Sequence, residues 1–269
     1  MTRPYKFGWV RDRRDSRDHH FSLTFRVPVS LPPRADLRAG CSPIEDQAKL
    51  GSCTAQALVG ALEFLEIRAG FHFVDLSRLL LYYDERAAEG TVATDSGAQL
   101  RTGIKVLASK GVCRESLWPY FIDKFADKPM DACYTEAAQH TILAYQRLDT
   151  LADMKACLAV GLPFTFGFTV YRSALADAVA ESGNIPLPSL WDRIRGSIGG
   201  HAVLAVGYED ATGKLLFRNS WGSAWGCDGY GTLPYEYFAG NLWGDAWCIQ
   251  RTQNDLYATN QFANGIVTV

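Results

Sequence analysis

Residues 47–57 read Gln47-Ala48-Lys49-Leu50-Gly51-Ser52-Cys53-Thr54-Ala55-Gln56-Ala57, a turn of small residues that runs into a helical pattern. Apolar residues then recur at helical spacing from Leu58 to Ala69, with charged residues between them. We therefore expect an amphipathic helix over residues 53–69. Cys53 would lie in its first turn.

That position gives Cys53 a chemical interpretation. A helix N-terminus offers unpaired backbone N–H groups and about half a positive charge. Both favour a thiolate, so Cys53 is expected to be acidified and is a candidate nucleophile. Gln47 can place its side-chain amide beside the N–H of Cys53 as a donor to an oxyanion. Taken alone, the turn is equally compatible with a buried cysteine that acts as a small hydrophobe.

A second stretch supplies a histidine and an asparagine. His201 heads the β-branched, apolar run of residues 201–208, and residues 215–222, which contain Asn219 and Trp221, follow within one hairpin. Paired strands would bring His201 and Asn219 together as a base and the group that orients it, with Trp221 as a shield. An isolated histidine is more often structural, and Trp221 could be an ordinary core aromatic.

Three stretches, residues 47–57, 200–208 and 219–230, resemble in order and spacing the signature blocks of the papain family of cysteine peptidases. In that family the histidine follows the cysteine by roughly 130–150 residues. The likeness covers most of residues 36–252. It implies an α+β fold in which a mainly helical subdomain, 39–135, carries the nucleophile. An antiparallel β-barrel-like subdomain, 136–252, would carry the histidine and asparagine, with the active site in the cleft between the two.

The resemblance also implies a mechanism. The Cys53 thiolate would attack a peptide carbonyl and form a thioester, while His201 moves the proton, Asn219 orients His201, and Gln47 and the Cys53 N–H hold the oxyanion. Contacts with a peptide or protein substrate are implied for Gly97, Ala98, Gln99, Gly167, Gly200, Ala202 and Trp221. Gly97 could instead be only a turn residue.

Small residues at two of these positions bear on substrate choice. Gly167 and Ala202 would leave room for a bulky apolar group in the pocket for the substrate's second side chain. No residue in the sequence selects a natural substrate.

The chain departs from the family pattern near the nucleophile. Thr54 stands where most relatives have tryptophan, and Leu50 and residues 95–97 stand where secreted relatives carry two bonded cysteines. The loss of that disulfide suits a reducing compartment. The N-terminus leads into charges without an apolar signal region, so we expect a cytoplasmic protein or one exported by an unconventional route.

Further elements follow from hydrophobic periodicity. Helices are expected over residues 76–86, capped by Ser77, over 98–110 and over 151–160. Strands are expected over residues 140–148, 162–170, 201–208, 214–220, 230–233 and 246–251, and a long loop over 171–195 near the groove.

The two ends of the chain differ in composition from the rest of the sequence. Residues 1–38 mix both signs of charge with a proline-containing stretch, which favours extended structure. They form either a solvated arm or a short inhibitory segment that lies over the groove. Residues 253–269 are a polar tail of ambiguous structure.

Composition excludes several classes. A net charge of −2 creates no positive electrostatic field that would attract nucleic acid. No apolar run is as long as a membrane-spanning helix requires. The seven cysteines lack zinc-type spacing, and no metal or other cofactor is expected. Two alternatives remain: an acyltransferase or ligase on the same site, and a catalytically silent relative that binds peptides in the cleft.

Overall fold

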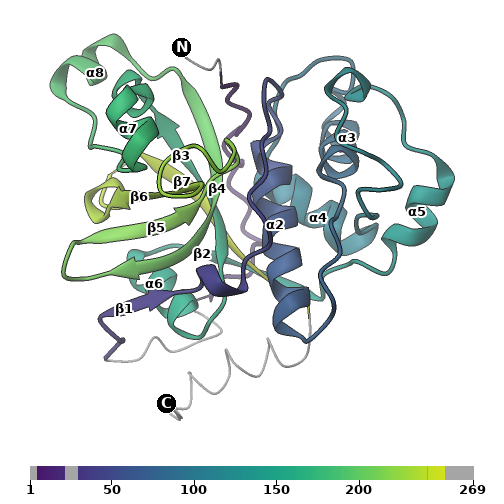
Figure 1. Cartoon of the computed structure of the whole chain (residues 1–269), viewed down its shortest axis with the longest axis horizontal. Coiled ribbons are helices and arrows are strands. Elements are labelled where there is room, and N and C mark those ends of the chain that lie inside the picture. Colours follow the sequence, from purple (N-terminus) through teal and green to yellow (C-terminus); the bar gives the residue numbers. More distant parts are fainter. Residues whose placement is uncertain (1–4, 22–29, 241, 252–269) are drawn as a thin grey trace.

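The computed structural model describes residues 5–21, 30–240 and 242–251. Four helices lie on one side of the molecule and an antiparallel sheet lies on the other (Figure 1). The helices are α2 (Cys53–Arg68), α3 (Arg78–Glu89), α4 (Leu100–Ser109) and α5 (Asp131–Ala137). Both sides contribute to one cluster of buried apolar side chains. The α+β class expected from the sequence is confirmed. The predicted tail, 253–269, lies outside the described residues.

The sheet has seven strands, β1 (Arg34–Asp36), β2 (Ala144–Leu148), β3 (Phe164–Val170), β4 (Gly199–Glu209), β5 (Lys214–Arg218), β6 (Tyr230–Pro234) and β7 (Trp243–Gln250). The strands pair antiparallel in the order β2-β7-β3-β4-β5-β6, with β1 beside β4. Each expected strand overlaps one of β2 to β7. Because β2 and β6 do not pair within the described part of the chain, the sheet is open and less barrel-like than expected.

Helix α2 lies between the sheet and the other helices, so the expectation that it is amphipathic is wrong. It packs on β4 as well as on α3 and α4, and every residue from Cys53 to Glu66 is buried. Its carboxylates are paired inside the protein: Glu63 Oε2 lies 2.6 Å from Arg78 Nη2, and Glu66 Oε1 lies 2.8 Å from His140 Nδ1. The two glutamates of this helix therefore mark buried pairs rather than a solvent face, and among its charged residues only Arg68, at its end, is exposed.

The next two helices begin near the expected residues. The Ser77 hydroxyl accepts a hydrogen bond of 3.1 Å from the N–H of Leu80 at the start of α3, as the capping pattern predicted. Helix α4 begins at Leu100, two residues later than expected, because Ala98 is extended against another segment. On the sheet side, α6 (Leu151–Ala159) begins with a capping box between Thr150 and Asp153.

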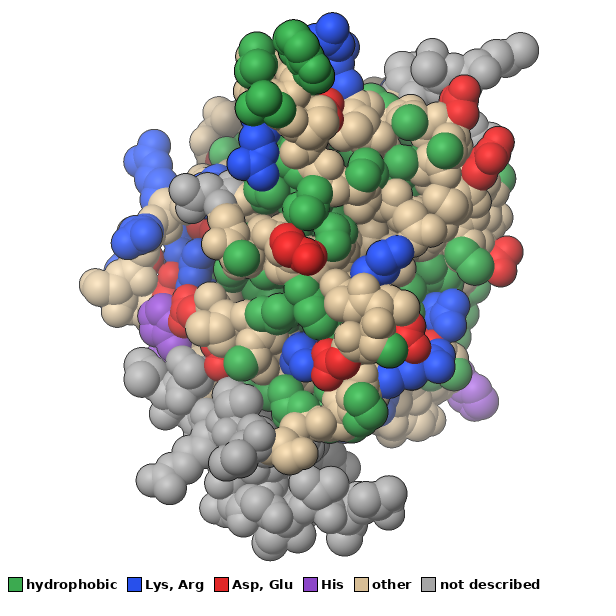
Figure 2. Space-filling view, turned by 90° about the vertical axis from the view of Figure 1, so that its left-hand side faces the viewer, with side chains coloured by type: hydrophobic (Ala, Val, Ile, Leu, Met, Phe, Trp, Pro, Cys, Tyr) green, Lys and Arg blue, Asp and Glu red, His purple; other side chains and the backbone are tan. Residues whose placement is uncertain are grey.

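The stretch expected to be a long loop, residues 171–195, contains short helices instead. They are η3 (Arg172–Leu175), α7 (Asp177–Ser182) and α8 (Leu190–Arg195). Ser189 and Asp192 form a capping box that starts α8. Trp191 and Leu190 of α8 are largely exposed, and Figure 2 shows hydrophobic side chains projecting at the top of the molecule, where Figure 1 places α8.

Residues 5–21, called the N-terminal segment below, run between the helical side and the sheet (Figure 1). Trp9 forms a parallel bridge with Ala98, and the Trp9 N–H donates 3.0 Å to the carbonyl of Gly200 in β4. The segment thus bonds to both sides of the molecule.

Candidate active site

His201 and Asn219 lie together because β4 and β5 pair antiparallel. His201 Nε2 is 2.8 Å from Asn219 Oδ1, and the same oxygen accepts a hydrogen bond of 2.9 Å from the N–H of Ser220. An atom that accepts from a backbone N–H is the amide oxygen, so Nε2 of His201 is the donor in this pair. The other ring nitrogen, Nδ1, is buried and has no hydrogen-bond partner within the described residues.

Trp221 covers this pair. Its ring stacks on His201 with the centroids 4.6 Å apart, and Tyr5 of the N-terminal segment stacks on the other side at 4.2 Å. His201 is fully buried, and burial lowers its pKa to about 4, against the opposing effect of the hydrogen bond with Asn219. The imidazole is therefore neutral in this closed arrangement.

Cys53 is the first residue of α2, and its sulfur lies against β4 at Ala202, the residue that follows His201. The N–H of Ala202 donates to Cys53 Sγ at 3.4 Å. Burial raises the pKa of Cys53 to about 11, although backbone N–H groups of Ala202 and Gly8 act in the opposite direction. The expected acidification by the helix N-terminus is absent here, because the desolvation of a fully buried sulfur outweighs it.

Gln47 presents its side-chain amide to the N-terminal segment. Its Oε1 accepts 2.7 Å from the hydroxyl of Ser220. The other end of the amide faces two carbonyl oxygens, which can only accept, so that end carries the nitrogen. Nε2 then donates 2.9 Å to the carbonyl oxygen of Lys6 and 2.8 Å to that of Leu50. The carbonyl oxygen of Lys6 thus accepts a hydrogen bond from Nε2 of Gln47, the atom expected to stabilise an oxyanion.

The N-terminal segment forms backbone hydrogen bonds with both sides of the molecule, at Ala98 before α4 and at Gly200 in β4. The N–H of Ala98 donates 2.8 Å to the Gly8 carbonyl, and the N–H of Val10 donates 3.0 Å to the Ala98 carbonyl. Ala98 therefore makes the backbone contacts that the resemblance implied for Gly97. Gly97 donates its N–H to the Tyr82 hydroxyl instead, and a Cβ on it would lie 2.0 Å from the Gly8 carbonyl oxygen.

Trp9 fills the space left by two of the predicted substrate contacts. A Cβ on Gly167 would lie 2.0 Å from the Trp9 ring, and one on Gly200 would lie 2.5 Å from it. Trp9 itself is only 8% exposed. Gln99 precedes α4 and gives its N–H to Glu89 at 2.9 Å; among the described residues, no hydrogen bond or ion pair joins its side chain to the segment.

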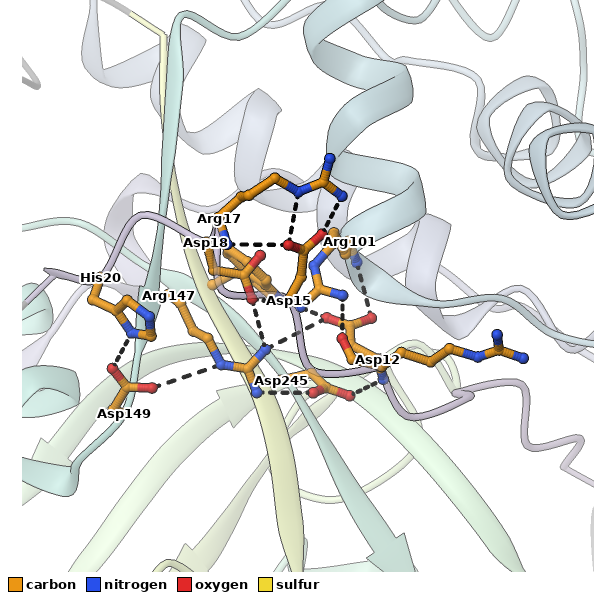
Figure 3. Close-up of polar contacts among 11 residues, drawn as sticks. Asp12, Asp15, Arg17, Asp18, His20, Arg101, Arg147, Asp149 and Asp245 are labelled. Carbon is orange, nitrogen blue, oxygen red and sulfur yellow. Dashed lines mark hydrogen bonds and ion pairs between the residues drawn. The ribbon is translucent and has the colours of Figure 1, made fainter.

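Charged groups anchor the far part of the segment (Figure 3). Asp18 pairs with Arg101 of α4 at 2.5 Å and with Arg147 of β2 at 3.5 Å. Asp12 gives its N–H to Asp245 of β7. The charges that suggested a solvated arm thus form ion pairs and hydrogen bonds with the body of the molecule.

Sequence reasoning missed the contacts of Tyr5, Phe7 and Trp9. These aromatic residues alternate with Lys6 and Gly8, the pattern of an extended strand with one apolar face. That alternation could have been noticed. Its partner could not, because Gly200 and Ala98 are far away in the sequence.

Neither a metal-binding cluster nor a membrane-spanning helix occurs in the part of the chain that the structure describes. No group of three or more His, Cys, Asp or Glu side chains there could hold a metal ion. None of the helices there is long and apolar enough to cross a membrane.

Solved structures resemble this arrangement. Xylellain, a cysteine protease from Xylella fastidiosa, superposes with a TM-score of 0.84 at 40% identity, over 91% of this chain and 96% of that one. Digestive procathepsin L2 of Tenebrio molitor shares the fold, with a TM-score of 0.68 at 24% identity, over 91% of this chain and 78% of that one.

Sequence comparisons agree. A peptidase C1-like protein of Acanthamoeba polyphaga mimivirus is 36% identical over 93% of this chain and 88% of its own length. Cysteine proteinase 3 of Solanum lycopersicum is 29% identical over 82% of this chain, which spans 60% of that protein. The family described as papain family cysteine protease matches residues 31–241. The chain therefore belongs to the papain family of cysteine proteases, as its three sequence blocks predicted.

Proposed function

We propose that this cysteine protease hydrolyses peptide bonds through Cys53, His201 and Asn219, and that the N-terminal segment keeps the site closed until it is displaced. One observation carries the first part: Asn219 holds one ring nitrogen of His201, the other has no partner within the described residues, and Ala202, the next residue of the same strand, donates its N–H to the sulfur of Cys53. Such an imidazole can exchange a proton with that sulfur.

The chemistry begins with proton transfer. When the segment leaves and water enters, the desolvation that raises the pKa of Cys53 and lowers that of His201 is relieved. Proton transfer from Sγ to Nδ1 then gives a thiolate and an imidazolium. Asn219 accepts from Nε2–H in both states of the ring, which fixes its orientation.

Acyl transfer follows in two steps. The thiolate attacks the carbonyl carbon, and the oxygen takes up the charge beside Nε2 of Gln47 and the N–H of Cys53. The C–N bond breaks as His201 protonates the amine, which leaves a thioester. His201 then takes a proton from water, hydroxide adds to the thioester carbon, the C–S bond breaks, and the acid departs.

The second part of the proposal rests on the contacts of the segment. Residues Tyr5 to Val10 bond to Gly200, Ala98 and Gln47 and cover both Cys53 and Trp221. A substrate that needs the same backbone groups cannot bind while the segment is in place.

Covalent labelling tests the nucleophile. A Cβ on Gly8 would lie 1.7 Å from the Gly51 carbonyl oxygen, so Gly8→Ala is a background in which the segment is displaced. We expect an epoxide inhibitor of cysteine peptidases to add one equivalent at Cys53 in this background, and Cys53→Ala to abolish the labelling. Replacing the exposed Cys227 by alanine is the matched control and should leave it intact. Stoichiometric labelling at another cysteine would overturn the assignment.

The same background separates hydrolysis from acyl transfer. A peptide substrate is incubated with a labelled amine, and the products are identified by mass. Hydrolysis gives the free acid; predominance of the amide would instead favour an acyltransferase.

A further inference from the structure

We propose that one exposed corner of the molecule, called the α8 tip below, binds the surface of a lipid bilayer that carries anionic headgroups. The tip consists of the apolar side chains of Leu187, Leu190, Trp191 and Ile194 and the guanidinium groups of Arg193 and Arg195. None of these residues belongs to the site of Cys53 and His201, so the proposal goes beyond the peptidase function and does not depend on it.

The apolar side chains of the α8 tip are turned to solvent. Leu190, Trp191 and Ile194 are 72%, 69% and 65% exposed, more than any other large apolar side chain in the described part of the chain. Leu190 and Ile194 lie one turn apart on the helix, so together with Trp191 they form one contiguous surface. A contiguous exposed apolar surface marks an interaction site.

The fold holds α8 in this orientation. Its only acid, Asp192, accepts hydrogen bonds from the N–H of Ser189 at 3.0 Å, from the hydroxyl of Ser189 at 2.8 Å and from the N–H of Ser173 in η3 at 3.4 Å. The acidic side chain thus attaches the helix to its neighbours while the apolar side chains face water. This is the reverse of a helix that packs its apolar face on a core.

Shape and composition favour a bilayer as the partner. Figure 2 shows the hydrophobic side chains projecting from the top of the molecule, with Lys or Arg side chains beside them. A projecting apolar group can enter a deformable lipid surface without needing a matching hollow. Tryptophan and leucine that enter the headgroup region beside cationic side chains are typical of protein segments that lie on membranes.

Charge favours anionic headgroups and disfavours a second copy of the chain. Arg193 and Arg195 are exposed and form no ion pair with another described residue. Their guanidinium groups can therefore donate to phosphate or carboxylate oxygens of lipids. Two α8 tips packed against each other would instead bring four guanidinium groups together, and like charges at an interface weaken binding.

The experiment measures binding of the full chain to vesicles by flotation. One set of vesicles is pure phosphatidylcholine, and the other contains about 30% phosphatidylserine. We expect partitioning into the anionic vesicles to be about 10- to 30-fold stronger, the effect of two arginines near an anionic surface. This preference should decline as salt is raised, because it depends on charge.

Variants separate the apolar contribution from the charged one. Trp191→Ser should weaken partitioning into both sets of vesicles by about tenfold or more, because it removes a large apolar side chain. Leu143→Ser, at a leucine elsewhere that is 57% exposed, is its control and should change nothing. The double variant Arg193→Gln, Arg195→Gln should lose most of the preference for phosphatidylserine, whereas Lys128→Gln, at another exposed cation, should keep it.

A second measurement uses the wild type alone, so it does not depend on the folding of any variant. Trp191 is the only exposed tryptophan among the described residues. Brominated lipids in the anionic vesicles should therefore quench part of the tryptophan fluorescence when the tip enters the bilayer.

Absence of binding to both sets of vesicles would overturn the proposal, as would binding that Trp191→Ser leaves unchanged or binding without quenching. A dimer that Trp191→Ser dissociates, in the absence of vesicle binding, would overturn it in favour of a second copy. These results leave the peptidase function standing, because covalent labelling of Cys53 tests that function separately.

Discussion

The backbone N–H of Asp12 donates a hydrogen bond of 2.6 Å to Oδ2 of Asp245, which brings two buried carboxyl groups together where the N-terminal segment meets β7. Nε1 of Trp247 donates 2.9 Å to Asp12, and Arg147 lies near both acids (Figure 3). Burial, followed by the charge of Asp245, raises the pKa of Asp12 to about 6. Burial also raises the pKa of Asp245.

These raised pKa values make closure of the segment depend on pH. The closed form binds a proton more tightly than the open form, in which Asp12 regains the ordinary pKa of about 3.9. Closure is therefore strongest below about pH 4 and weakens as pH rises from about 4 to about 6, by up to about 100-fold between the two limits. Arg101 lowers the pKa of Asp12 and itself pairs with Asp18, and Arg11 lowers the pKa of Asp245.

Hydrogen exchange at Trp9 and Val10 measures this effect, since both N–H groups are bonded in the closed form. After correction for intrinsic exchange, their protection should fall between about pH 4 and pH 6. Asp12→Asn, which cannot ionise, should flatten the dependence. Protection that rises with pH would contradict the sign of the linkage.

Displacing the segment should activate the enzyme. Gly8→Ala places a Cβ against the Gly51 carbonyl, and overpacking of this kind disfavours the closed form by about 1–3 kcal/mol. Peptide hydrolysis by Gly8→Ala should therefore be about 5- to 150-fold faster than by the wild type. Ser16→Ala, at an exposed position of the same segment, should leave the rate unchanged. Equal rates for Gly8→Ala and the wild type would argue against occlusion.

Filling the Trp9 pocket should change substrate choice. Gly167→Val would occupy the space that the Trp9 indole fills. In the Gly8→Ala background, we expect kcat/KM to fall by roughly 10- to 200-fold for peptides with a large second side chain, and to change little for those with alanine there. Gly240→Ala, whose Cβ would meet no atom within 4 Å, is the control. An equal fall for both peptides would indicate a general defect.

The buried pair of Glu63 and Arg78 should dominate the stability of the helical side. Glu63 also accepts from Ser42 and from the N–H of Leu76, and both charged side chains are nearly inaccessible. Glu63→Leu leaves the buried guanidinium of Arg78 with only the more exposed Asp75 and Glu45 as ion-pair partners, so the free energy of unfolding in urea should fall by up to about 3 kcal/mol. The double variant Glu63→Leu, Arg78→Met should recover much of that loss. No recovery would mean that the pair is not the cause.

Local sequence patterns predicted much of this structure. The hydroxyl of Ser77 and the hairpin around His201 and Asn219 were predictable because a cap and a two-strand register depend on nearby residues. The order and spacing of the three sequence blocks, residues 47–57, 200–208 and 219–230, predicted the papain family. The all-round burial of α2 was not predictable, because Glu63 is neutralised by Arg78 from another helix.

The N-terminal segment shows more clearly that contacts between residues distant in sequence could not be predicted. The pairing of Trp9 with Ala98 and Gly200 depends on contacts that no local pattern contains. The pKa shift of Cys53 is opposite to the expected one for that reason. The start of the helix favours a thiolate, whereas the segment, which is distant in sequence, buries the sulfur and raises its pKa. The short helices α7 and α8 were missed because their few residues give too weak a periodicity.

The most direct test is the pH profile of Cys53 alkylation by iodoacetamide in the Gly8→Ala background, with and without His201→Ala. If Cys53 and His201 exchange a proton in the open site, the thiol should react with an apparent pKa below the ordinary value of about 8.5, and His201→Ala should return it to that value or above. An apparent pKa of about 8.5 or higher in both proteins would contradict the account.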